Sequence, residues 1–456
     1  MQKKPETGAP DAALATAARE GTPLMEVRDL EVHFALRTGN LARLLGRSGG
    51  SVKAVDGVTF DLMPGEVLGL VGESGSGKST LGRALLGLVP ATAGTVSYRG
   101  EQVTGRSERA LRPLRRKLQM VFQDPHASLN PSMDIETAVG HPLRIHGLTK
   151  GTTQTRAKVV TALERVGLSP TERYLTKYPG DLSGGQKQRA VLARATILDP
   201  ELLVADEPVS MLDMSVRAKI LELMLNLRRD LDLTYVYITH DLATAKFFCD
   251  RVAIMYLGRI VEIGTVEEIF ADPKHPYTRS LLKAIPQLDP SQRVQQDLPR
   301  GEIPDAAQPP LGCSFHPRCP AAFEVCGWET RDLRTLLEER WLTLDPQDYD
   351  REQAVFGDLS GLDRAGYSAT LQSSRGHSGE EIAAELHAIR ESDPEEPLWK
   401  GVREVRVEGD VVQVEFFDGV DPGLLPAGGV VVACHLYDEG QRREAEQLEA
   451  TQDLEI

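Results

Sequence analysis

The chain has 456 residues, 41% of them hydrophobic and 26% charged, which is enough to bury a large core and to form two or three domains. Its net charge is −15, and the acidic excess is uneven: residues 327–456 carry 12 basic and 30 acidic side chains, which leaves residues 1–326 at +3. An acidic chain without a basic stripe is a poor binder of nucleic acid, and no apolar run approaches the roughly 18–20 residues that cross a bilayer.

The first 23 residues contain no apolar segment of the kind found in signal peptides, so we expect a disordered leader. Five cysteines without a secretion signal indicate a reducing compartment, where a cysteine cluster holds a metal or an iron–sulfur centre more often than it forms disulfides.

Apolar and β-branched runs separated by Gly and Pro predict strands between residues 25 and 100, with a Gly- and Arg-rich insertion at 35–51. Residues 105–195 are expected to be mostly helical, because apolar residues recur there at helical spacing. Strand patterns return at 201–208, 233–241 and 251–264. Strands that alternate with helices favour a parallel α/β sheet with an inserted helical block.

A Pro-rich linker follows from Ile285 and leads to a cysteine-containing segment, 313–326. The pattern at 380–389 is typical of a helix, and alternation at 402–419 about a Gly-Asp pair predicts a β-hairpin. We interpret residues 330–428 as a small separate α+β unit.

The strongest chemical signal is a glycine-rich segment between a predicted strand and a predicted helix. Its glycines allow backbone N–H groups to wrap phosphate oxygens, Lys78 can reach the β- and γ-phosphates, and Ser79 can ligate Mg²⁺. The predicted ATP-binding residues are Gly72, Glu73, Ser74, Gly75, Ser76, Gly77, Lys78, Ser79 and Thr80.

Two carboxylates follow the apolar run 202–205, at the end of a strand where open α/β sheets bind ligands. Asp206 is placed to hold Mg²⁺ through water, and Glu207 to polarise the attacking water. Taken alone, an Asp-Glu pair after a strand usually lies in a solvated turn. Its occurrence in the same chain as the phosphate loop favours the catalytic interpretation.

The segment Leu182, Ser183, Gly184, Gly185, Gln186 resembles the signature of ABC ATPases. The order of other motifs fits as well: Gln123 resembles the Q-loop glutamine, which also ligates Mg²⁺, residues 210–213 resemble the D-loop with Asp213, and His240 resembles the switch histidine. The resemblance implies a P-loop NTPase of ABC type: an α/β RecA-like core with an antiparallel β subdomain and a helical signature subdomain. It also implies a head-to-tail dimer that holds ATP between one phosphate loop and the other subunit's signature.

Residues 272–279 and 309–320 resemble the C-terminal hallmarks of ATP-binding subunits from oligopeptide, dipeptide and nickel importers, and further details resemble the F-type subunit. This resemblance implies a paralogous D-type partner, two membrane-spanning permeases, an extracytoplasmic substrate-binding protein, and residence on the cytoplasmic face of the inner membrane. A homodimer stays open, as does the substrate: dipeptide, longer peptide, nickel chelate or sugar oligomer.

The resemblance also divides the chain. It implies an ABC ATPase domain at 24–290, with its helical subdomain at about 124–200, and a C-terminal extension made of 291–329 and 429–438. The unit at 330–428 then interrupts that extension, and 439–456 is a charged tail. We expect the inserted unit to be a regulatory or interaction module that faces away from the membrane, or else to be passive.

In this family Cys313, Cys319, Cys326 and Cys434 are implied to bind a [4Fe–4S] cluster. Zinc is an alternative, because His316 and His435 lie beside the cysteines, and free thiols are another. Since 107 residues separate Cys326 from Cys434, the site requires that the inserted unit return the chain close to its start.

Three further side chains are considered individually. Cys249 is expected in the core, and so is Phe34, for which adenine stacking is the alternative. Met211 stands in the D-loop where a small residue is common. Two other functions stay open: a soluble ABC ATPase acting on ribosomes or DNA, and a redox-sensing module centred on the cysteines.

Overall fold

The computed structural model describes residues 21–36, 50–285, 299–373 and 375–442, in two units. The first unit is Met1–Asp272 with Gly428–Val431, and the second is Pro273–Ala427 with Val432–Ile456. Nearly all of the predicted leader, the centre of the Gly- and Arg-rich insertion, most of the linker after Ile285 and the tail from 443 onward lie outside the described residues.

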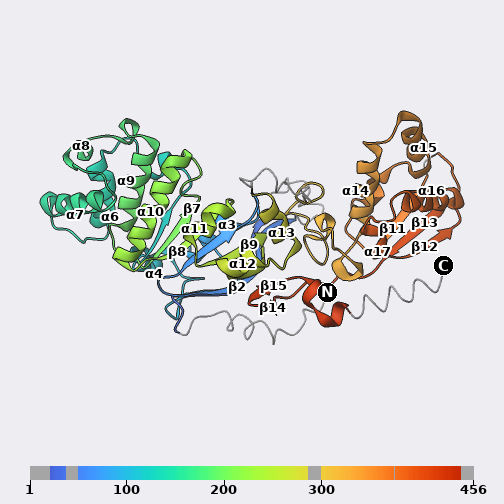
Figure 1. The fold of residues 1–456 in the computed structure, drawn as a ribbon, viewed down its shortest axis with the longest axis horizontal. Helices are drawn as coiled ribbons and strands as arrows, with labels where there is room; N and C mark the ends of the chain where they lie inside the picture. The colour runs from blue at the N-terminus through green and yellow to red at the C-terminus, as the bar shows by residue number, and fades with distance from the viewer. Residues whose placement is uncertain (1–20, 37–49, 286–298, 374, 443–456) are drawn as a thin grey trace. The chain divides into compact units, whose positions relative to one another are not determined.

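The first unit is built on a mainly parallel sheet (Figure 1). Every residue of four of its strands is buried, so these strands are covered on both faces. Six neighbouring strands of this sheet have the order β10-β9-β3-β8-β7-β6, and β15 lies beside β10. Among the described pairs of these six strands, β9 and β10 are antiparallel and the others are parallel. The strands are β3 (Val67–Val71), β6 (Leu118–Val121), β7 (Leu202–Asp206), β8 (Thr234–Thr239), β9 (Arg251–Tyr256), β10 (Arg259–Thr265) and β15 (Val430–Val432). Four helices follow strands of this sheet: α3 (Lys78–Leu85), α10 (Met214–Leu231), α11 (Leu242–Phe248) and α12 (Val266–Ala271).

A second, antiparallel sheet has the order β2-β1-β4-β5. Its strands are β1 (Met25–Ala35), β2 (Ser51–Leu62), β4 (Ala93–Tyr98) and β5 (Glu101–Gln102). Buried and partly exposed residues alternate along most of β1, as expected for a sheet with one face on the core.

Helices dominate the segment between β6 and β7, and α6, α7 and α9 pack against one another. The helices of this region are α5 (Pro125–Ser128), α6 (Ile135–Ile145), α7 (Thr152–Arg165), α8 (Glu172–Leu175) and α9 (Gly184–Thr196), and the short helix α4 (Glu108–Leu111) precedes β6. The interpretation of 105–195 as helical missed β6. Four residues, three of them apolar, are too few to show a period, and only pairing with β7 makes them a strand.

Glu201 connects the small sheet to the start of β7. Its carboxylate accepts hydrogen bonds from Tyr98 Oη (2.8 Å) and Arg99 Nε (2.7 Å), and pairs with Lys117 Nζ (3.0 Å). Burial acts to raise the pKa of Glu201, but these donors outweigh it and lower the pKa to about 2. A carboxyl with a lowered folded-state pKa adds stability above its unfolded pKa and loses it as pH falls through the folded pKa.

We therefore expect Glu201→Gln to lower the free energy of unfolding by about 1 kcal/mol at neutral pH, because a charged acceptor with three donors is removed from a partly exposed site. The difference from wild type should shrink between pH 4.5 and about 2. Urea unfolding across that range measures it, with exposed Glu164→Gln as the control. An unchanged difference at low pH would contradict the assignment.

The second unit holds a three-stranded antiparallel sheet of order β11-β13-β12, against which α16 packs (Figure 1). The hairpin β12/β13 turns at Gly409, whose φ is 64°, so the predicted hairpin and the predicted helix are both confirmed. The elements are α13 (Pro276–Lys283), α14 (Thr330–Trp341), α15 (Pro346–Phe356), β11 (Ser368–Gln372), α16 (Gly379–Ser392), α17 (Leu398–Gly401), β12 (Val402–Glu408), β13 (Val411–Phe416) and β14 (Leu425–Ala427).

The two ends of the inserted unit meet. The amide of Val420 donates to the carbonyl of Val325 (3.0 Å), and a Cβ on Gly419 would collide with Gly327. The chain thus leaves and rejoins the C-terminal extension at one place. In the described part of the chain, no helix combines the length and the apolar character needed to cross a membrane.

Candidate functional site

The phosphate-binding segment forms a tight loop between β3 and α3. Gly75 and Gly77 have φ values of 82° and 96°, in the left-handed region that favours glycine. A Cβ on Gly77 would also collide with the carbonyl oxygen of Ala54 on β2. The loop therefore needs glycine at Gly77 both for its backbone conformation and for the close approach of β2.

Lys78 lies inside this loop and is 5% exposed. Its Nζ donates to the carbonyl oxygens of Gly72 (2.8 Å) and Glu73 (2.7 Å) and to Ser76 Oγ (3.1 Å). Burial lowers the pKa of Lys78, and nearby carboxylates oppose this shift. The ammonium is held by neutral acceptors at the position where terminal phosphates of a bound nucleotide would meet it.

Ser79 and Asp206 offer paired oxygens at the carboxyl end of β7. Ser79 Oγ donates to Asp206 Oδ1 (2.8 Å), and Arg83 lies 4.0 Å from the other carboxylate oxygen. Asp206 is 2% exposed, and burial raises its pKa. A hydroxyl beside a buried carboxylate is a donor set that suits Mg²⁺.

Glu207 follows Asp206 with a φ of 45°, and its amide donates to the carbonyl of Ile238 (2.9 Å), which turns the chain out of the strand. Its carboxylate accepts from Gln123 Nε2 (3.0 Å) and lies 3.0 Å from His240 Nδ1. These three side chains follow β6, β7 and β8, neighbouring parallel strands. The sheet therefore brings together the three residues predicted to be catalytic.

The signature segment begins α9. Ser183 Oγ accepts from the amide of Gln186 (3.4 Å), and the Gln186 side chain accepts from the amide of Ser183 (3.0 Å). A Cβ on Gly185 would lie 2.8 Å from Val216 Cγ1, and a Cβ on Gly184 3.4 Å from Leu212. The reciprocal cap fixes a helix N-terminus, which favours a bound anion.

The D-loop is held by a residue that the sequence analysis missed. Arg217 on α10 donates to the carbonyls of Leu212 (2.7 Å) and Ser210 (3.1 Å), and Ser210 Oγ donates to the carbonyl of Glu207 (3.1 Å). Asp213 caps α10 through the amide of Val216 (3.0 Å). An arginine four residues after the predicted Asp213 would have been a signal, because it lies one helical turn further along.

Met211, the unusual D-loop residue, is 62% exposed. Phe34 is 45% exposed, so the expectation of a core position is wrong. Phe34 stands near the end of β1 opposite Val52 on β2, two residues from Ala54, whose carbonyl meets Gly77 of the phosphate loop. The Phe34 ring is exposed because β1 extends beyond the hydrophobic core at this end.

Cys249 packs against the core, as predicted. A Cβ on Gly69 of β3 would lie 2.8 Å from its Sγ, and burial raises the pKa of its thiol.

The other four cysteines lie together in the second unit and line one small cavity. Burial, followed by the neighbouring thiols Cys313 and Cys434, raises the pKa of both Cys319 and Cys326. The amide of Cys313 donates to the carbonyl of Cys326 (2.9 Å), which joins the two ends of the cysteine segment. Within the described residues, no group of three or more His, Cys, Asp or Glu side chains is arranged as a metal site.

The two neighbouring histidines already have partners. His316 Nδ1 lies 2.8 Å from the carbonyl of Cys313, and its Nε2 lies 2.9 Å from Asp332 Oδ2. His435 Nε2 lies 2.8 Å from the carbonyl of Val420. Both ring nitrogens of His316 are therefore engaged. Four thiols are the donor set that an iron–sulfur cluster takes, whereas a zinc site can combine thiolates with an imidazole such as that of His435.

Comparison with known proteins agrees with this geometry. Residues 55–210 match the ABC transporter family, and residues 261–326 match the oligopeptide/dipeptide transporter C-terminal region. The oligopeptide transport ATP-binding protein AppF of Bacillus subtilis is 43% identical over 314 residues, which cover 68% of this chain and 93% of AppF. The oligopeptide transport ATP-binding protein OppF of Escherichia coli is 44% identical over 305 residues, 66% of this chain and 90% of OppF.

A solved ATP-binding cassette, dimeric and bound to ADP and Pi, matches with a TM-score of 0.47 and 26% identity, covering 53% of this chain and 98% of that chain. The predicted fold class, an α/β P-loop ATPase of ABC type, is confirmed by the matched family. The chain belongs to the ABC transporter family, among the ATP-binding proteins that carry the oligopeptide/dipeptide transporter C-terminal region.

Proposed function

We propose that this protein hydrolyses ATP to energise an importer of peptides or related solutes. The observation that carries the proposal is the contact of Glu207 with both Gln123 and His240, beside the Ser79–Asp206 pair. The names of AppF and OppF, oligopeptide transport ATP-binding proteins, support the coupling to peptide transport.

Glu207 accepts the proton of the water that attacks the γ-phosphate, and its two hydrogen-bond partners orient its carboxylate. Lys78 neutralises charge on the β- and γ-phosphates. Ser79, Gln123 and Asp206 would hold Mg²⁺, which when bound supplies charge neutralisation at the phosphates. His240 is well exposed, with 60% of its side chain accessible, and so can reach the γ-phosphate.

ATP is sandwiched at a head-to-tail dimer interface. The capped start of α9 presents Ser183 and the amides of Gly184 and Gly185 to the γ-phosphate bound by a second subunit. Leu182, which is 5% exposed, anchors that turn, and Asp213 contacts the partner's site. Loss of the γ-phosphate removes these shared contacts, so the two ATPase subunits separate. Their separation drives the alternating access of the permeases.

The partners in this proposal are a paralogous D-type ATPase subunit, two transmembrane permeases and an extracytoplasmic substrate-binding protein. The protein is then peripheral on the cytoplasmic face of the inner membrane. The absence of a spanning helix in the described residues is compatible with that role.

The cysteine quartet holds a [4Fe–4S] cluster in this proposal. The convergence of Cys313, Cys319, Cys326 and Cys434 on one cavity supports it, and so does the meeting of the two ends of the inserted unit, which carries the chain back to Cys434. When bound, the cluster would supply a covalent crosslink of the extension through its thiolates.

Reconstitution with the permeases and binding protein tests the function. We expect ATP-dependent uptake of peptide into vesicles and co-purification with the permeases. A soluble ABC ATPase would hydrolyse ATP without binding permeases. In a redox-sensing module, replacing the cysteines would abolish the redox dependence of ATP turnover. ATP turnover without binding to the permeases would reject the importer.

Phe34 is proposed to stack on the adenine. Because stacking on an aromatic ring is worth about 1–3 kcal/mol per base, Phe34→Ala should weaken ATP binding roughly 5- to 150-fold. Calorimetric titration with ATP measures this. Phe247→Ala, at another exposed phenylalanine (61%), is the matched control, and equal affinities in the two variants would exclude Phe34 from the adenine site.

A further inference from the structure

Arg217, near the start of α10, holds the backbone of the D-loop through two nitrogens of its guanidinium group. Its Nε donates to the carbonyl oxygen of Leu212 (2.7 Å), and its Nη2 donates to the carbonyl oxygen of Ser210 (3.1 Å). The two acceptors are two residues apart in the chain, so one planar group with several fixed donors restrains the whole turn between them. Both hydrogen bonds are partly buried, and both have a charged donor, which strengthens them.

Ser210 transmits this restraint to Glu207. The hydroxyl and the amide of Ser210 both donate to the carbonyl oxygen of Glu207 (3.1 and 3.3 Å). On its other side, the amide of Glu207 donates to the carbonyl oxygen of Ile238 on β8 (2.9 Å). The peptide groups before and after the Glu207 Cα are therefore both fixed, one by the sheet and the other by the D-loop.

The backbone of Glu207 needs such a restraint. Its φ of 45° lies in the left-handed region, where a residue with a side chain is strained and stays only if its surroundings hold it there. The backbone conformation also sets the direction of Cβ, and with it the contacts of the carboxylate with Gln123 and His240 (3.0 Å each). If the D-loop were released, Glu207 could relax to a negative φ and its carboxylate would turn away.

The contacts of Arg217 indicate a role in shaping this loop. Among the described residues, Arg217 forms no ion pair with a carboxylate, and its guanidinium donates to main-chain oxygens instead. The loop that it holds also lies against the start of α9, where a Cβ on Gly184 would be 3.4 Å from Leu212. Loss of Arg217 could therefore act through Glu207 or through the signature segment, and an experiment has to separate these two routes.

We propose that Arg217 is a positioning residue for ATP hydrolysis. It holds the D-loop so that Glu207 keeps the left-handed backbone conformation that directs its carboxylate toward the attacking water. The inference rests on the proposed function, because it requires Glu207 to be the general base. It extends that function by giving a role to a side chain that belongs to none of the nucleotide-site motifs.

Steady-state ATP turnover and calorimetric ATP binding of the full chain test the proposal. Because small displacements of a catalytic group are costly, Arg217→Ala should lower kcat roughly 10- to 100-fold and leave the affinity for ATP unchanged. Lys219→Ala removes the same charge from an exposed position of α10 and should keep the wild-type kcat. Arg217→Lys retains the charge, but one ammonium cannot serve both carbonyls, so its kcat should lie between those of Arg217→Ala and wild type.

Single-turnover measurements on the double variant Glu207→Gln/Arg217→Ala identify the route. A residue that acts only by positioning Glu207 has nothing left to position once the base is gone, so the double variant should be no slower than Glu207→Gln alone. Losses that multiply would overturn the proposal. So would loss of the ATP-dependent dimer in Arg217→Ala, because the signature segment would then be the route.

An undiminished kcat in Arg217→Ala, or full activity in Arg217→Lys, would also overturn it, the latter because charge alone would then suffice. Thermal melts identify a variant that fails to fold, and Arg217→Lys and the double variant then carry the test. A wild-type protein that does not hydrolyse ATP would reject the proposed function itself. Normal wild-type turnover that Arg217→Ala shares would reject only the role of Arg217.

Discussion

Replacing Glu207 by glutamine is expected to lower ATP turnover by roughly 10²- to 10⁴-fold, because glutamine has nearly the same shape as glutamate but cannot act as the general base. The amide can still contact Gln123 and His240, which lie 3.0 Å from the two carboxylate oxygens in the native protein. ATP should therefore bind and hold a dimer that releases phosphate only slowly. Phosphate release and size-exclusion chromatography with ATP and Mg²⁺ measure the two effects.

Glu172→Gln, on the short helix α8 of the helical block, is the control and should hydrolyse ATP like wild type. Undiminished phosphate release from the Glu207→Gln protein would refute its role as the base. If turnover fell without a nucleotide-dependent dimer, the head-to-tail arrangement would be the part of the proposal that fails.

Replacement of Cys434 by serine is expected to abolish the visible absorption of anaerobically purified protein and to remove most of its iron. A cubane cluster normally has four thiolate ligands, and the serine hydroxyl is a much poorer ligand. Because the cysteines lie in the second unit and the ATP site in the first, basal ATP turnover should change far less than absorption. Absorption spectra and iron and sulfide analysis provide the measurement.

Cys249→Ser is the matched control, since this thiol packs against the core of the first unit. It should leave the spectrum unchanged. Stoichiometric zinc in a colourless wild-type protein would show that the quartet binds zinc, and four reactive thiols with no metal would show that it binds neither.

The nucleotide site was largely predictable because its chemistry is local. The phosphate loop is one uninterrupted segment. Asp206 ends a strand whose four preceding residues are apolar, and Glu207 directly follows that strand. Parallel strands end at one edge of the sheet, so the residues after β6, β7 and β8 meet by topology. The same logic failed for β6 itself, whose existence depends on its neighbour.

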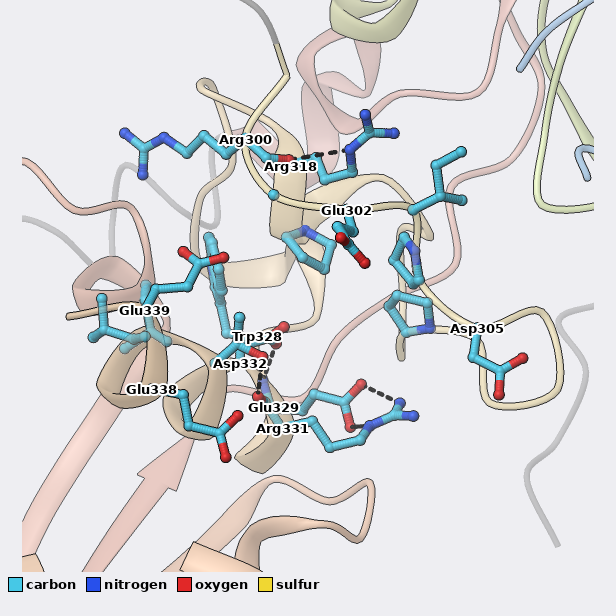
Figure 2. A pocket seen from close by; sticks show the side chains of 18 of the residues that line it. Arg300, Glu302, Asp305, Arg318, Trp328, Glu329, Arg331, Asp332, Glu338 and Glu339 are labelled. Carbon is cyan, nitrogen blue, oxygen red and sulfur yellow. Dashed lines mark hydrogen bonds and ion pairs between the residues drawn. The ribbon is translucent and has the colours of Figure 1, made fainter. Parts of the chain in front are cut away.

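Features that depend on tertiary packing could not be read from the sequence. Phe34 has the pattern of a core strand residue, yet β1 extends past the core. The engagement of both nitrogens of His316 depends on Asp332, which belongs to the inserted unit. The pocket that Glu302, Trp328 and Glu339 line forms only when residues 300–310 and α14 fold together (Figure 2).

The hydrogen bond from Val420 to Val325 has a consequence for how this family member could have arisen. Ends that touch let an extra domain enter a loop without stretching it, so the surrounding scaffold needs no rearrangement and a few residues could bridge the gap if the domain were lost. The contact of Asp332 with His316 links the inserted unit to the C-terminal extension. Excision would remove the partner of His316 Nε2 and leave the contact of Nδ1 with the carbonyl of Cys313.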